Sequence, residues 1–125
     1  MQKPPRILIV EDEPLIAQIL EDWLEELGCE VVGPARSVEA ALNHVANDSF
    51  QAAILDVKVI DGVTYEVGDA LKARGIPFAV ATGYGDADRH PSFSSAQILE
   101  KPFDFAVAST VIKDMLSRAQ SPSAQ

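Results

Sequence analysis

Two hydrophobic patterns alternate along this chain. Short runs rich in valine, isoleucine and leucine predict strands, and longer stretches with apolar residues every three or four positions predict helices. The first run, Arg6 to Val10, is apolar at almost every position, as expected of a strand covered on both faces. Regular alternation of strands and helices is typical of an α/β fold around a parallel sheet.

The same patterns divide most of the chain into elements. The predicted strands are residues 6–10, 30–33, 52–57, 77–81 and 96–99. The predicted helices are residues 14–27 before Gly28, a helix capped by Ser37, residues 65–73, and a last helix capped by Asp104.

One segment, Gly83 to Ser95, interrupts this rhythm. It lies where a fourth helix belongs, but it contains Pro91, three serines and two glycines. We therefore expect a loop or a short, irregular helix there. The chain from Ser117 onward is expected to fray, and residues 119–125 to form a disordered tail.

Polar side chains stand where four of the predicted strands end. Glu11 and Asp12 follow the first strand, Asp56 ends the third, Thr82 the fourth, and Lys101 follows the fifth. Parallel strands deliver their carboxyl ends to one edge of the sheet, where ligands bind. The five side chains are therefore expected to converge.

This set of side chains suits phosphoryl chemistry. Three carboxylates within a few ångströms repel one another and would hold protons unless a cation compensates. A hard divalent ion such as Mg²⁺ prefers these oxygen ligands and is common where phosphate is handled. Lys101 adds a second positive charge, and Thr82 adds a hydroxyl donor. An aspartate nucleophile could accept a phosphoryl group in such surroundings.

Four motifs resemble the landmarks of CheY-like response-regulator receiver domains. They are Ile7-Leu8-Ile9-Val10-Glu11-Asp12-Glu13, Ile54-Leu55-Asp56, Ala81-Thr82-Gly83 and Glu100-Lys101-Pro102-Phe103. They occur in order between about Arg6 and Leu116, so the resemblance covers nearly the whole chain. It implies a receiver domain over residues 6–118 with a flavodoxin-like, doubly wound parallel sheet of five strands in the order 2-1-3-4-5.

The resemblance also implies a metal site. Asp56 would be the phosphoacceptor and a ligand of Mg²⁺. Asp12 would bind the ion directly, and Glu11 would bind it directly or through water. The backbone carbonyl of Lys58 would complete the share of the metal shell that the protein supplies.

Two further residues are implied to contact the phosphoryl group. Lys101 would pair with it, and Thr82 would rotate to hydrogen-bond it. The peptide bond between Lys101 and Pro102 is implied to be cis.

The residues from Pro77 to Tyr84 are similar to the Pro-Phe-x-Phe-Ala-Thr-Gly motif of the FAT GUY subgroup, with Val80 in place of the second phenylalanine. That subgroup lacks the usual switch aromatic on the fifth strand, and the matching residue here is Ile98. Lys58 and Tyr84 occupy two positions that vary among receivers, so their roles stay open.

The resemblance implies a single-domain response regulator of a two-component phosphorelay. A histidine kinase, for which the subgroup resemblance implies the HWE type, or a phosphotransfer protein would phosphorylate Asp56, and the signal would pass on by protein contact. The protein would be a monomer or a weak dimer. It would not be an enzyme beyond its own phosphorylation and dephosphorylation.

Composition narrows the partners and the location. The chain has 125 residues, enough for one domain, and a formal net charge of −9, which argues against nucleic-acid binding. It has no apolar run of the ~20 residues that span a bilayer and no signal-peptide pattern, so a cytoplasmic protein without membrane contact is expected.

Three alternative functions remain open at this point. A small Mg²⁺-dependent aspartyl-phosphate phosphohydrolase usually has a second acid two residues after the nucleophile, where this chain has Lys58. A flavin mononucleotide binder would need a phosphate-cradling loop after the first strand, where the acids from Glu11 to Glu13 would repel phosphate. A degenerate receiver that acts only as an interaction module would not need the intact set of acids, threonine and lysine.

Overall fold

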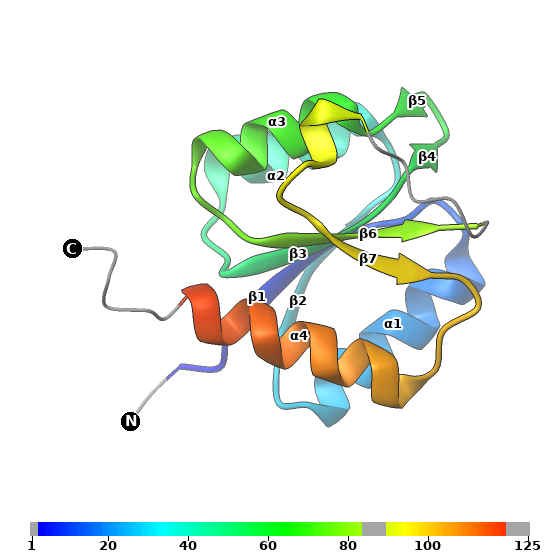
Figure 1. Ribbon diagram of the computed structural model, residues 1–125, viewed down its shortest axis with the longest axis vertical. Helices are drawn as coiled ribbons and strands as arrows, with labels where there is room; N and C mark the ends of the chain where they lie inside the picture. The colour runs from blue at the N-terminus through cyan, green and yellow to red at the C-terminus, as the bar shows by residue number, and fades with distance from the viewer. Residues whose placement is uncertain (1–2, 84–89, 120–125) are drawn as a thin grey trace.

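Five parallel strands form the central sheet of the chain, which a computed structural model describes over residues 3–83 and 90–119 (Figure 1). Their spatial order is β2-β1-β3-β6-β7. This is the predicted order 2-1-3-4-5, because β4 and β5 form a separate small hairpin. The strands are β1 (Arg6–Val10), β2 (Glu30–Ala35), β3 (Ala52–Asp56), β4 (Lys58–Val59), β5 (Gly62–Val63), β6 (Phe78–Thr82) and β7 (Gln97–Glu100).

Four α-helices within the described residues cover the two faces of this sheet, as expected of a doubly wound fold. Figure 1 shows α2 and α3 on one side and α1 and α4 on the other. The helices are α1 (Pro14–Glu26), α2 (Val38–Asn47), α3 (Tyr65–Ala73) and α4 (Phe105–Ala119). No helix in the described ranges is both long and apolar enough to cross a bilayer.

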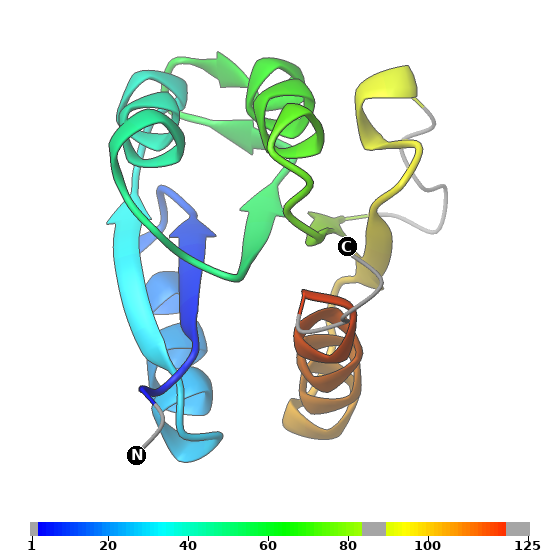
Figure 2. The same cartoon turned by 90° about the vertical axis from the view of Figure 1, so that its left-hand side faces the viewer.

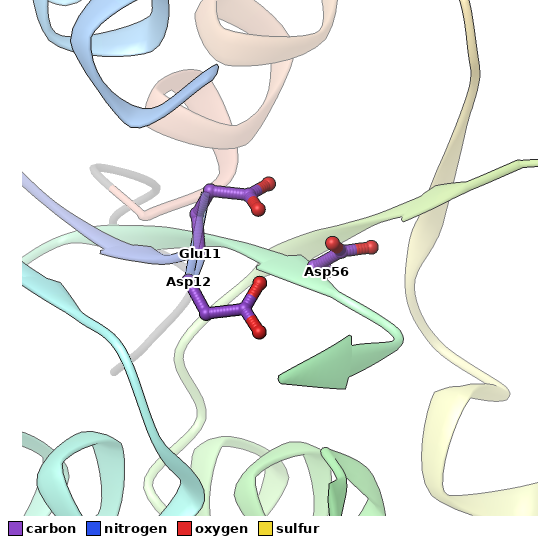
Figure 3. A group of neighbouring side chains, drawn as sticks. All are labelled: Glu11, Asp12 and Asp56. Carbon is purple, nitrogen blue, oxygen red and sulfur yellow. The ribbon is translucent and has the colours of Figure 1, made fainter. Parts of the chain in front are cut away.

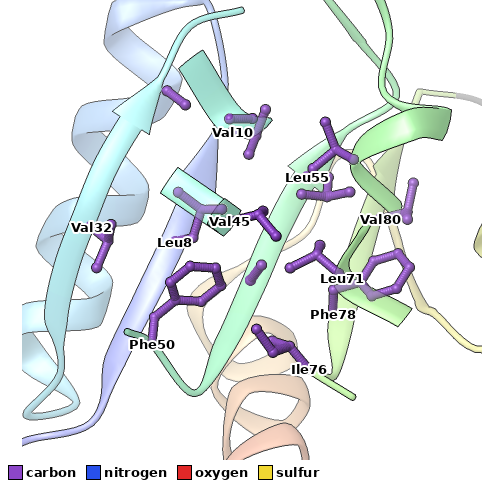
Figure 4. Packing of buried hydrophobic residues seen from close by; sticks show 14 of the residues in the cluster. Leu8, Val10, Val32, Val45, Phe50, Leu55, Leu71, Ile76, Phe78 and Val80 are labelled. Atoms are coloured by element: carbon purple, nitrogen blue, oxygen red, sulfur yellow. The ribbon is translucent and has the colours of Figure 1, made fainter. Parts of the chain in front are cut away.

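Alternate residues of β1 enter two separate hydrophobic clusters. Leu8 and Val10 face α2 and α3, whereas Ile7 and Ile9 face α1 and α4. All four side chains are almost completely buried, which confirms a strand covered on both faces. Figure 4 shows the first cluster, in which the strand residues meet Val45 of α2, Leu71 of α3 and the rings of Phe50 and Phe78.

The amino end of α2 is capped from two places in the sequence. The Ser37 hydroxyl accepts a hydrogen bond from the Ala40 amide at 3.0 Å, as predicted. Asp61, at the tip of the β4–β5 hairpin, accepts hydrogen bonds from the amides of Val38 at 2.6 Å and Glu39 at 3.3 Å. The bond from the Val38 amide lowers the pKa of the Asp61 carboxyl. The hairpin that follows Asp56 is thereby tied to α2.

Replacing Ser37 with alanine is expected to lower the free energy of unfolding by about 1 kcal/mol, because the Ala40 amide loses its acceptor. Urea denaturation of the purified protein measures this difference. Ser37→Asp, which restores an acceptor at the cap, should recover most of the loss. Equal stability of wild type and Ser37→Ala would show that the cap contributes nothing.

The described part of the irregular segment contains one short 3-10 helix, η1 (Pro91–Phe93), in place of a regular fourth helix. Residues 84–89 of this segment, with Tyr84, lie outside the described residues. η1 lies beside α3 in both views (Figures 1 and 2). Gly68 makes this close approach possible, because a Cβ atom there would lie 2.9 Å from the backbone oxygen of Ser92.

The last helix begins where the sequence predicts and ends later. The Asp104 carboxylate accepts a hydrogen bond from the Val107 amide at 3.0 Å, which confirms the predicted cap. The prediction of fraying from Ser117 is wrong up to Ala119, because α4 continues to that residue. An ion pair of 2.9 Å between Arg118 Nε and Asp114 Oδ2 links successive turns there. Residues 120–125 lie outside the described residues.

Candidate functional site

Three acidic side chains meet at the carboxyl edge of the sheet. Glu11 and Asp12 follow β1, Asp56 ends β3, and one carboxylate oxygen from each lies within 4.8 Å of the others. Figure 3 shows the three carboxylates gathered at this edge. The parallel pairing of β1 with β3 brings these residues together, as the sequence predicts.

The Asp56 carboxylate is held by two donors. Its Oδ1 atom accepts a hydrogen bond from the Val57 amide at 2.9 Å and from Lys101 Nζ at 3.2 Å. The Lys101 and Asp56 side chains are 28% and 17% exposed, so this ion pair is partly shielded but still open to a reactant. Within the described residues, both hydrogen bonds to the carboxylate end on Oδ1, and none ends on Oδ2.

Thr82 and Lys101 are positioned by neighbouring strands. Asp56 pairs with Ala81 across β3 and β6, so Thr82 lies one residue further along the same edge. The Lys101 amide donates to the Thr82 carbonyl oxygen at 2.7 Å, which places the two residues side by side. Thr82 is buried, and the bond between Lys101 and Pro102 is cis. The structure therefore brings together the residues that end four strands.

Glu11 is a buried acid with unusual proton affinity. Only 3% of it is exposed, and the pKa of the Glu11 carboxyl is raised from 4.5 to about 7, chiefly by this burial. The negative charges of Asp56 and Asp12 contribute to the rise, whereas the hydrogen bond from the Glu13 amide and the charge of Lys101 oppose it. The surroundings of Glu11 therefore do not fully stabilise the negative charge of its carboxylate beside Asp12 and Asp56.

These donors fit a hard divalent cation. All three groups offer carboxylate oxygens, the ligand type that Mg²⁺ and Ca²⁺ prefer. A cation there would also offset the burial and the neighbouring negative charges that raise the pKa of Glu11. Lys58 lies two residues beyond Asp56, at the start of β4, and its side chain is exposed. The metal-binding role of its backbone carbonyl stays a prediction.

One residue of the site was missed from the sequence. Thr64 is completely buried, and its hydroxyl donates a hydrogen bond to the backbone oxygen of Asp56 at 2.7 Å. A threonine directly before a helix is normally interpreted as a helix cap. Nothing in the sequence marks this one as a contact of Asp56.

The position of the usual switch aromatic is occupied by an aliphatic residue. Ile98 lies in the middle of β7, pairs with Val80 across the strands and is 37% exposed. An aromatic ring that moves with Thr82 is therefore absent from this position of β7.

The comparison with known protein families identifies the chain. A model of the response regulator receiver domain matches residues 7–113. The phyllosphere-induced regulator PhyR of Methylorubrum extorquens is 36% identical over 124 residues, which cover 92% of this chain and 45% of PhyR. The transcriptional regulatory protein PdtaR of Mycobacterium tuberculosis is 31% identical over 120 residues, covering 92% of this chain and 58% of PdtaR. The chain thus spans about half the length of these two relatives.

Solved structures agree with this assignment. SdrG from Sphingomonas melonis Fr1 is 42% identical, with a TM-score of 0.78 over 93% of this chain and 99% of SdrG. A CheY-like receiver domain protein from Methanospirillum hungatei is 28% identical, with a TM-score of 0.84 over 94% of this chain and 97% of that protein. Fold, sequence and strand-end residues agree, and the chain belongs to the response regulator receiver domain family, the phosphoacceptors of two-component signalling.

Proposed function

We propose that Asp56 accepts a phosphoryl group from a phosphohistidine of a histidine kinase or phosphotransfer protein, in a reaction that depends on Mg²⁺. The observation that carries this proposal is the ion pair between Asp56 and Lys101 beside two further acids. A carboxylate nucleophile, an ammonium group and a set of oxygen ligands for a cation are what an aspartyl phosphate requires.

The transfer forms one bond and breaks one. Oδ2 of Asp56 attacks phosphorus, the phosphorus–nitrogen bond of the phosphohistidine breaks, and the imidazole leaves with its electron pair and takes up a proton. Lys101 Nζ, 3.2 Å from Oδ1, stabilises the negative charge on the phosphoryl oxygens. The Val57 amide keeps Oδ1 in place, so the attacking oxygen is oriented before the donor arrives.

Glu11, Asp12 and Asp56 would hold the cation. When bound, Mg²⁺ would supply positive charge to the phosphoryl oxygens and lower the repulsion between the acids and the incoming group. Thr82 ends β6 beside Lys101, where its hydroxyl is suited to donate a hydrogen bond to a phosphoryl oxygen. The backbone carbonyl of Lys58 is the fourth protein ligand in this proposal.

The relatives support a signalling role. PhyR and PdtaR are named as regulators, and SdrG, 42% identical to this chain, has also been solved in a BeF3-activated conformation with a TM-score of 0.75. A beryllium trifluoride group has the tetrahedral shape of a phosphoryl group. We extend this role to a chain that passes its signal to another protein, since its charge of −9 disfavours nucleic acid. We further propose that the kinase is of the HWE type. The chain would be a monomer or a weak dimer and would be located in the cytoplasm.

The test is direct chemical phosphorylation. The protein is incubated with acetyl phosphate or phosphoramidate, with and without Mg²⁺, and its intact mass is measured. One added phosphoryl group is expected only with Mg²⁺, and reductive trapping followed by peptide mapping should locate it on Asp56. A label on another residue, or no label with either donor, would contradict the proposal. Sustained release of phosphate from simple phosphate esters would instead indicate the phosphohydrolase alternative.

A further inference from the structure

We propose that Thr64 is a positioning residue for the phosphoacceptor, which it orients by holding the peptide unit that joins Asp56 to Val57. The inference rests on the proposed function of Asp56. It assigns a role to the loop that returns from β3 to α3, which the family's strand-end motifs do not include.

Thr64 makes two contacts with the residues that follow β3. Its hydroxyl donates to the Asp56 backbone oxygen at 2.7 Å, and the Val57 oxygen lies 3.1 Å from the same hydroxyl. Its own amide donates to the Val57 oxygen at 2.8 Å. Thr64 has no exposed surface, so water does not compete for these bonds. The start of α3 is thus fastened to the chain directly after Asp56.

The Thr64 hydroxyl does not cap the helix that follows it and bonds to a distant residue instead. A threonine that precedes a helix usually has an extended backbone and accepts a hydrogen bond from an amide of the first turn. Thr64 has φ −86° and ψ 23° and makes no side-chain cap of α3. Its hydroxyl instead reaches across the loop to residue 56, which lies eight positions earlier.

The peptide bond transmits this restraint to the carboxylate. The Asp56 carbonyl and the Val57 amide belong to one planar peptide unit, so fixing the carbonyl restricts the direction of the amide. That amide donates to Oδ1 of the Asp56 side chain at 2.9 Å. Thr64 therefore restricts rotation of the carboxylate. This restriction keeps Oδ2 oriented for attack on the phosphorus atom of a donor.

Two substitutions separate this role from simple packing. Thr64→Val keeps the shape of the side chain and removes the donor, whereas Thr64→Ser keeps the donor and removes the methyl group. Thr64→Ala removes both and replaces Thr64→Val if valine prevents folding. Thr110→Val is the matched control, because the Thr110 hydroxyl also donates to a backbone oxygen, that of Ala106 at 3.1 Å, far from the site in α4.

Two measurements report on the restraint. The first is the amide signal of Val57 in ¹⁵N–¹H NMR spectra of the 125-residue chain without Mg²⁺ or phosphodonor. The second is the rate of labelling by acetyl phosphate at saturating Mg²⁺. Loss of one hydrogen bond is expected to slow labelling about fivefold to tenfold. It should also shift the Val57 amide signal and speed its hydrogen exchange by a similar factor.

The expected result is that Thr64→Val and Thr64→Ala change both readouts, while Thr64→Ser and Thr110→Val stay within twofold of the wild type. The inference is overturned if Thr64→Ser slows labelling as much as Thr64→Val, or if the Val57 amide is unchanged without the hydroxyl. Failure of the wild type to become labelled would count against the proposed function. The NMR comparison would still decide the role of Thr64.

Discussion

Asp56→Asn is expected to abolish labelling by acetyl phosphate, with a decrease in rate of at least about a hundredfold. An amide oxygen is a poor nucleophile, and no other carboxylate oxygen is paired with Lys101 at the same edge of the described sheet. Intact-mass spectrometry over a time course measures the loss.

The fold of this variant should be preserved. Removing the Asp56 charge relieves repulsion with Glu11 and Asp12, and Lys101 is exposed enough to remain hydrated without its partner. Asp69→Asn is the matched control, since Asp69 is exposed on α3, and it should be labelled like the wild type. Labelling of Asp56→Asn at an undiminished rate would mean that another residue is the acceptor.

Glu11→Gln is expected to weaken Mg²⁺ binding by about tenfold to a hundredfold and, at the same time, to stabilise the metal-free protein above pH 7. The effect on stability follows from the pKa of Glu11, which is about 7 in the folded protein. Above that pH, folding places an extra negative charge in a buried acidic cluster. A neutral amide avoids this cost but is a poorer ligand for a cation.

The pH dependence has a definite sign. Because the pKa of Glu11 is raised from 4.5 to about 7, the folded state holds a proton that the unfolded state has already lost between these values. Stability of the metal-free wild type should therefore fall as pH rises through this window, by an amount on the order of 3 kcal/mol. Glu11→Gln should lack this fall.

Urea denaturation between pH 5 and pH 8, with EDTA or with saturating Mg²⁺, tests these statements. Added Mg²⁺ should stabilise the wild type at pH 8 and much less at pH 5, where protons compete for Glu11. Glu26→Gln is a suitable control, because Glu26 is exposed at the end of α1. An identical pH profile for wild type and Glu11→Gln would show that Glu11 is not responsible.

The parts of this molecule that follow from local pattern could be predicted. The apolar run from Arg6 to Val10 required a strand covered on both faces, and the parallel topology then placed the residues at the strand ends on one edge. Asp56 and Lys101 met there without further assumptions. These predictions depend only on the spacing of apolar residues along the sequence and on the direction of the strands.

The parts that depend on contacts between distant residues could not be predicted. The Thr64 hydroxyl bonds to Asp56, although its position before a helix suggests an ordinary cap. The tip of the hairpin caps α2 through Asp61, which lies 23 residues after Val38, so no local pattern marks this contact. Fraying was predicted from Ser117, but α4 continues to Ala119, and an ion pair between Arg118 and Asp114 links its last turn to the preceding turn.

The close packing of η1 against α3 has a consequence for protein engineering. A glycine inside a helix usually costs about 1 kcal/mol relative to alanine, so replacing it is a standard way to raise thermal stability. At Gly68 the added methyl group would press against the Ser92 carbonyl and the ring of Phe93. Gly68 should therefore be left unchanged when the protein is engineered for stability. The gain in helix propensity would be offset by the energy needed to move two packed segments apart.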